Sequence, residues 1–137
     1  MTVKELIQSE GFLLVQEGED TERRITVPYC CDLLSIAMGR APEGCAWVTV
    51  MGNMNTLAVA SLADAACVIL AEGVTLDEPS VKKAKEQGIT VLRTELPVFE
   101  AALKVHQMLA ECISEAGTSG KGALDAAAAD TVSFFRG

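Results

Sequence analysis

Five cysteines and one histidine are the side chains of this sequence best suited to nucleophilic, redox or metal chemistry. The cysteine count is odd and no CxxC spacing occurs, so we expect neither a zinc site nor a disulfide framework. Cys30 and Cys31 would point to opposite faces of a strand, and a bridge between such neighbours would strain the backbone. Core packing is therefore the favoured role of the thiols. His106 lies on an apolar stripe of a predicted helix, where a structural role is favoured over that of a base.

The sequence EAGTSGKGA at residues 115–123 comes nearest to a phosphate-binding P-loop. Glu115 occupies the place of the first glycine, and Gly122 replaces the Ser or Thr that would hold magnesium. A helix also precedes the segment where a P-loop requires a strand. We therefore predict no phosphoryl transfer by such a loop, and we expect no catalytic residue, metal site or cofactor in this chain.

A second place for chemistry is the turn Gly52–Thr56, with the sequence GNMNT, between a predicted strand at 45–51 and a predicted helix at 56–65. In a parallel sheet, the loops after neighbouring strands share one rim, where helix N-termini present N–H groups to anions. Two further predicted strands end on that rim. The candidate site for a small anionic ligand therefore comprises Gly52, Asn53, Met54, Asn55, Thr56, Glu72, Gly73, Thr94 and Glu95.

The same turn has a structural interpretation, which the residue types favour. Gly52 and Asn53 suit turn geometry, and Asn55 or Thr56 could cap the helix that follows. The carboxylates of Glu72 and Glu95 would also oppose the binding of a phosphate group, because like charges repel.

The elements that must position these residues follow from the apolar pattern. From residue 46 to residue 115, strands and helices alternate, and the strands are apolar on both faces. That pattern predicts an α/β fold with a mainly parallel central sheet and flanking helices, in three layers or two. Before residue 46 we expect a helix at 3–10 with a capping box between Thr2 and Glu5, strands at 12–15 and 24–31, and a helix at 33–40 capped by Asp32.

Composition limits the classes of function. The chain has 137 residues and is 50% apolar, which suffices for one domain with a core. Its net charge of −8 predicts that it binds neither nucleic acid nor an anionic membrane. No apolar run approaches the roughly 20 residues of a membrane span, and the first residues resemble no signal peptide. A cytoplasmic protein is therefore expected.

A long helix is predicted from about Pro97 to Glu115, with more apolar surface than one sheet face covers. Its polar residues form a single strip, so the remaining arc must be covered by the tail, by another helix or by a second chain. On this pattern, cover from within the chain and dimerisation are both open. The candidate homodimer interface comprises Val98, Ala101, Val105, Met108 and Cys112.

The composition changes after Gly117 to a Gly/Ser joint, an alanine-rich stretch and the pair Phe134-Phe135. We therefore expect an α/β domain at 1–116 and a flexible tail at 117–137. The two aromatic residues of the tail are expected to dock on the domain or on a partner protein.

The segments at 29–39 (YCCDLLSIAMG) and 44–102 (GCAWVTVMGNMNT and onward) resemble the DRTGG domain. The likeness is one of order and spacing, over roughly residues 2–112. It implies a fold similar to the N-terminal domain of HPr kinase and a regulatory or assembly role in a dimer. The Asp-Arg-Thr-Gly-Gly sequence that names the family is replaced here by GNMNT, so its acid and its arginine are both missing.

These observations predict a non-catalytic regulatory or assembly module that forms a homodimer and senses a small anionic ligand or nucleotide. Two alternatives are open. One is a subunit or domain of an enzyme that handles a phosphorylated metabolite at the rim. The other is a structural scaffold subunit of a redox complex of the hydrogenase type, because genes for some members of the resembled family neighbour those for iron hydrogenase components.

Overall fold

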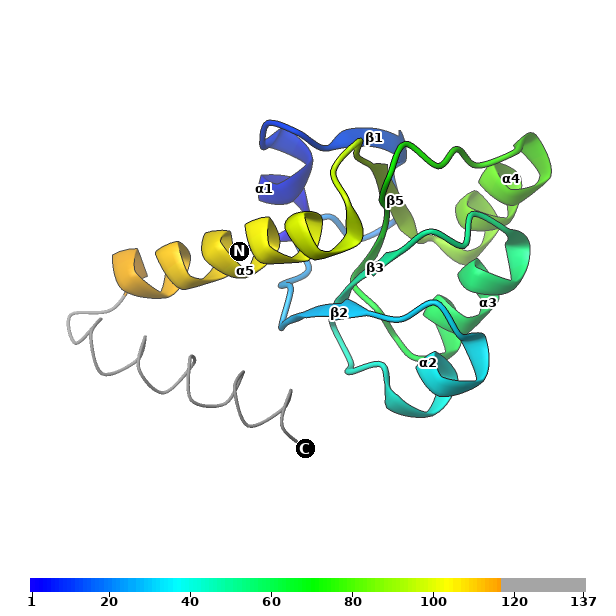
Figure 1. The fold of residues 1–137 in the computed structure, drawn as a ribbon, viewed down its shortest axis with the longest axis horizontal. Coiled ribbons are helices and arrows are strands. Elements are labelled where there is room, and N and C mark those ends of the chain that lie inside the picture. The colour runs from blue at the N-terminus through cyan, green and yellow to red at the C-terminus, as the bar shows by residue number, and fades with distance from the viewer. Residues whose placement is uncertain (117–137) are drawn as a thin grey trace.

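The computed structural model describes residues 1–116 of the chain and the side chains of residues 1–112. The fold has three layers, with a five-stranded sheet between two groups of helices (Figure 1). Helices α1 (Val3–Gln8) and α5 (Val98–Ala116) cover one face, and α2 (Leu34–Arg40), α3 (Met54–Leu62) and α4 (Glu78–Gln87) cover the other. The predicted α/β class is confirmed. The expected tail at 117–137 lies outside the described residues.

The sheet consists of β1 (Leu13–Gln16), β2 (Pro28–Cys30), β3 (Ala46–Thr49), β4 (Cys67–Leu70) and β5 (Thr90–Arg93), in the order β1-β5-β4-β3-β2. β2, β3, β4 and β5 run parallel, whereas β1 pairs antiparallel with β5 at one edge. The opposite edge strand, β2, is shorter than predicted and starts at its proline, which cannot donate a ladder hydrogen bond. The sheet is therefore mainly parallel, as the apolar strands predicted.

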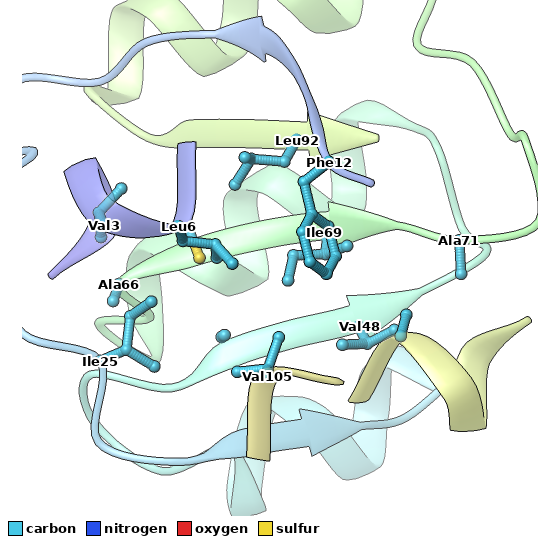
Figure 2. Close-up of a cluster of buried hydrophobic side chains, with 13 residues drawn as sticks. Val3, Leu6, Phe12, Ile25, Val48, Ala66, Ile69, Ala71, Leu92 and Val105 are labelled. Atoms are coloured by element: carbon cyan, nitrogen blue, oxygen red, sulfur yellow. The ribbon is translucent and has the colours of Figure 1, made fainter. Parts of the chain in front are cut away.

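Successive residues of β3, β4 and β5 alternate between two cores. On the side of α1 and α5, Leu6 and Val105 pack with Ile69 and Leu92 of the sheet (Figure 2). On the side of α2, α3 and α4, the core contains Trp47, Leu57, Val68, Leu70, Ala84 and Val91, all nearly or fully buried. Because both faces of each strand are covered by helices, the strands have no polar face, as is typical of parallel sheets.

Most helix ends follow the local signals in the sequence. The Thr2 hydroxyl accepts a hydrogen bond from the Glu5 N–H, and the Glu5 carboxylate accepts one from the Thr2 N–H, which confirms the capping box. Asp77 caps α4 by accepting from the Ser80 N–H at 2.9 Å, and Gly88 ends it at a φ of 67°. Helix α1 ends at Gln8, earlier than predicted.

The start of α2 differs from the prediction. Leu33, and not Asp32, occupies the N-cap position, and no side chain caps this helix. Ala37 is buried, but Leu33 and Ile36 are 57% and 43% exposed, so these two apolar side chains are largely uncovered within the described residues. Within residues 1–116, no helix combines the length and the apolar character needed to cross a membrane.

Candidate functional site

The candidate site lies on the rim, defined here as the loops that follow β2, β3, β4 and β5 at the carboxyl ends of these parallel strands (Figure 1). The turn 52–56 follows β3, residues 72–73 follow β4, and residues 94–95 follow β5. The residues selected from the sequence thus share one rim. Their hydrogen bonds form two groups, one around the turn 52–56 and one between the loops after β4 and β5.

Asn53 starts helix α3. Its side-chain oxygen accepts a hydrogen bond from the Thr56 N–H at 3.1 Å and lies 3.5 Å from the Thr56 hydroxyl oxygen. The helix cap is therefore Asn53, and the assignment of Asn55 or Thr56 as the cap is wrong. Thr56 is 1% exposed, so its polar atoms serve the turn, whereas Met54 and Asn55 are exposed.

Gly52 allows the loop after β4 to pass directly against the turn. A Cβ atom at this position would lie 2.8 Å from the Thr75 carbonyl oxygen and 3.0 Å from Val74 Cγ1. Those contacts are too close for a side chain, so close packing of the backbone accounts for the glycine. The chain itself fills the space beside Gly52, and a ligand would have to approach the turn from the side of Met54 and Asn55.

The backbone after β4 and β5 is used to tie two loops together. The Glu72 N–H donates to the Leu96 carbonyl at 2.8 Å, and the Gly73 N–H donates to the Thr94 carbonyl at 2.9 Å. Thr94 is 2% exposed, and its hydroxyl accepts from the Leu96 N–H at 3.2 Å. The backbone of this part of the rim therefore has a structural role, at Glu72, Gly73 and Thr94. The carboxylates of Glu72 and Glu95 are exposed beside it.

Arg93 was not selected from the sequence, yet it supplies positive charge to this part of the rim. Its Nη2 atom lies 3.2 Å from Oε1 of Glu95, and its Nε atom is buried without a hydrogen-bond partner among the described side chains and backbone. Glu95 also lies over Gly73, where an added Cβ would be 2.5 Å from Oε2. The signal that could have found Arg93 is a charged residue at the end of an otherwise apolar strand.

Asp32 was expected to cap α2, but it connects the ends of β2 and β3. One of its oxygens accepts hydrogen bonds from the Thr49 hydroxyl at 2.7 Å and from the Val50 N–H at 3.0 Å. The Met51 N–H in turn donates to the Thr49 hydroxyl at 3.2 Å. Backbone N–H groups at the end of β3 are thus satisfied by side chains, which leaves the first turn of α3 as the accessible source of N–H donors next to β3.

Core packing, the role predicted for the thiols, applies to Cys45 and Cys67 and is wrong for Cys30, which is exposed. All five cysteines are free, and Cys45 and Cys67 are fully buried. Burial raises the pKa of Cys45 to about 12 and also raises the pKa of Cys67. Desolvation of the sulfur and the Asp32 carboxylate raise the pKa of Cys30, although this residue is exposed as a whole. Each shift disfavours the reactive thiolate at neutral pH.

A hollow of about 110 Å³ lies at the opposite end of the sheet, near the ends of α3 and α4. Arg23 lines it and donates to Asp64 twice, from Nη1 to the carboxylate at 2.6 Å and from Nη2 to the backbone carbonyl at 2.8 Å. The hydrogen bond from Arg23 lowers the pKa of Asp64, and the same bond raises the pKa of Arg23. Both charges are therefore paired with each other.

Two of the five residues predicted for the dimer interface on α5 are buried within the chain, so the prediction is wrong for them. Ala101 and Val105 are fully buried against the sheet, so a second chain cannot contact them (Figure 2 shows Val105). These residues are covered by the sheet of the same chain, because α5 lies across β2 and β3. This was one of the two alternatives for the apolar surface of the helix. Val98, Met108 and Cys112 are half-buried and keep exposed surface.

No protein-family model and no curated protein matches this sequence. The fold is similar to a crystal structure of the CBS and DRTGG domains of the regulatory region of Clostridium perfringens pyrophosphatase, complexed with its activator diadenosine tetraphosphate, with a TM-score of 0.60 and 14% sequence identity. The match covers 73% of this chain and 44% of that chain. The likeness is one of fold, and it agrees with the DRTGG-like architecture expected from the sequence.

Proposed function

We propose that this chain is a non-catalytic regulatory module that binds a small anionic ligand, such as a nucleotide, at the rim. The observation that carries the proposal is the similarity in fold to the regulatory region of a pyrophosphatase whose structure contains a nucleotide activator. The position of the rim supports it, because open α/β sheets bind ligands beyond the carboxyl ends of their parallel strands.

The proposed contact is narrower than the set of residues selected from the sequence. The first N–H groups of a helix have no partners within the helix, and Asn53 occupies that of Thr56. The groups that could donate hydrogen bonds to an anion are then the other backbone N–H groups in the first turn of α3 and the side-chain amide of the exposed Asn55. The Glu72 and Glu95 carboxylates oppose an anion, and Arg93 offsets the charge of Glu95.

Binding at this place would act by shifting a population between conformations or assembly states, because a ligand favours the state that binds it more tightly. The chain would then report the concentration of its ligand to a partner without changing the ligand chemically. We retain the homodimer as part of this proposal, with Val98, Met108 and Cys112 as the accessible part of the predicted interface. The C-terminal turns of α5 project beyond the sheet, where a second chain can reach them (Figure 1).

A thermal-shift series with nucleotides and phosphorylated metabolites tests the ligand. A ligand at 100 times its Kd stabilises the native state by about 2.7 kcal/mol and so raises the midpoint of unfolding. The variant Asn55→Asp should abolish this rise, since its carboxylate repels an anion. It should not lower the midpoint of the free protein, because an acid is favourable in the first turn of a helix.

The matched control is Gln107→Glu, which adds the same charge on the exposed side of α5, away from the rim. This control separates a local effect at α3 from a general effect of net charge. Retention of the full ligand-induced shift in Asn55→Asp would contradict the proposed position, and the absence of a shift with every anion at millimolar concentration would contradict the proposed function.

A further inference from the structure

Helix α5 carries a second, largely apolar stripe on the side turned away from the sheet. Phe99, Leu103, His106 and Ala110 recur at spacings of four, three and four residues, which is the spacing of a seam between two packed helices. We call these four residues the outer stripe. Phe99 is 72% exposed and Leu103 is 39% exposed, while His106 and Ala110 are half-buried.

The outer stripe is distinct from the face that holds α5 to the sheet. At about 100° of rotation per residue, the stripe centres opposite Ala101 and Val105, which are fully buried in the core. A helix needs one apolar face to pack on a sheet, and α5 therefore has a second face that no described element covers. Exposed aromatic and aliphatic side chains in such a row mark a docking surface.

We propose that residues 123–135 of the same chain cover the outer stripe from Leu103 to Ala110, as the second arm of a helical hairpin antiparallel to α5. In this segment, Leu124, Ala128, Val132 and Phe135 recur at spacings of four, four and three residues, which puts them on one face of a helix. The run of alanines between them consists of the residue with the highest helix propensity.

The arm is long enough to cover this part of the stripe. At about 1.5 Å of rise per residue, a helix over 123–135 would be about 20 Å long, and the outer stripe from Phe99 to Ala110 extends about 17 Å. Helix α5 ends at Ala116, and six residues with glycines at 117, 120 and 122 remain for the reversal. Connections of this length are typical between antiparallel helices. The arm would bring Phe135 close to the level of Leu103, so that Phe99 lies beyond its end.

A segment attached to the end of α5 has two advantages over a second copy of the chain as the occupant. Its binding is intramolecular, so it is present at a high effective concentration and loses less freedom on docking. Arg136 would also come within about one turn of Glu100. An antiparallel second α5 centred on the outer stripe would instead bring Glu100 close to the partner's Glu111, and like charges at such a contact are unfavourable.

The test uses the full chain and the variants Phe135→Ser and Phe134→Ser. Phe134 lies about 100° from Phe135 around a helix, so Phe134→Ser is a matched control off the docking face. In methyl and aromatic NMR spectra, we expect the Leu103 and Ala110 methyl signals to move in Phe135→Ser and to stay in place in Phe134→Ser. We also expect a nuclear Overhauser effect between the Phe135 ring and the Leu103 methyl groups of the same molecule.

Mixing isotope-labelled with unlabelled chains distinguishes the occupants. An intermolecular contact to the outer stripe in the mixed sample, or a loss of the contact on tenfold dilution, would assign the stripe to a second copy and overturn the proposal. Identical outer-stripe signals in the wild-type chain and in Phe135→Ser would overturn it as well. Neither outcome bears on the ligand, which the thermal-shift series tests separately.

Discussion

The Thr49 hydroxyl and the Asp32 carboxylate form a part-buried polar contact on the rim. Thr49 has no exposed surface, and a buried hydroxyl without a partner would cost about 1–3 kcal/mol. The hydrogen bond to Asp32 removes that cost and fixes the end of β2 against the end of β3. Cys45 and Cys67, by contrast, act as small apolar groups whose burial opposes ionisation.

We expect alkylation of the thiols by iodoacetamide to follow their burial. At pH 8, Cys30 should react in the native protein, and its rate should rise with pH because burial and Asp32 hold its pKa above the ordinary value. Cys45 and Cys67 should react when the chain unfolds in urea. Peptide mapping by mass spectrometry checks this order. Labelling of Cys45 in the native protein at the rate of Cys30 would contradict the burial of Cys45.

Helix α3 is held in place by hydrogen bonds to its first turn and by packing of its side chains in the core. Its start is held by the Asn53 cap, and its inner side is held by Leu57 and Val59 in the core shared with α2 and α4. The turn before it is held by the loop after β4, which packs against Gly52. The helix that presents the proposed anion-binding groups is therefore anchored from three directions, so its N-terminus is preorganised.

The variant Asn53→Ala should lower the free energy of unfolding by about 1 kcal/mol, because it removes the side-chain acceptor of the Thr56 N–H. Asn55→Ala is the matched control, and we expect it to change the stability by less than about 0.5 kcal/mol, since Asn55 is exposed. Urea unfolding followed by the fluorescence of Trp47 measures both, because this single tryptophan is fully buried. Equal losses in the two variants would show that Asn53 is not the principal cap.

In the whole molecule, the rim proposed for ligand binding and the surface of α5 proposed for dimerisation lie at different positions. The rim lies at the carboxyl ends of the strands, whereas the C-terminal turns of α5 project past the sheet (Figure 1). The proposed ligand site and the proposed dimer surface therefore do not overlap.

We predict that light scattering gives a molar mass of about twice 14.5 kDa for the full chain at micromolar concentration. Met108→Lys should reduce the mass toward that of one chain, because a buried charge in an apolar interface is costly. Gln107→Lys adds the same charge to the exposed neighbour of Met108 and should leave the dimer intact. A single-chain mass for the wild-type protein at all concentrations would contradict the dimer.

The sequence by itself determined the features that depend on near neighbours. The capping box of Thr2, the start of α4 at Asp77 and its end at Gly88 are formed by residues within one or two helical turns of each other. The apolar runs of β3, β4 and β5 predicted a parallel sheet, because a strand covered on both faces has no place for polar residues.

The tertiary structure decided how distant residues combine. Asp32 pairs with Thr49 and Val50 across two strands, so its position before a helix was a misleading signal. In the sequence, Ala101 and Val105 are two of many apolar residues around α5, and the pattern alone does not show which side of the helix faces the sheet. The structure buries both residues against it. That choice depends on where α5 lies across β2 and β3, which is set by packing between segments far apart in the chain.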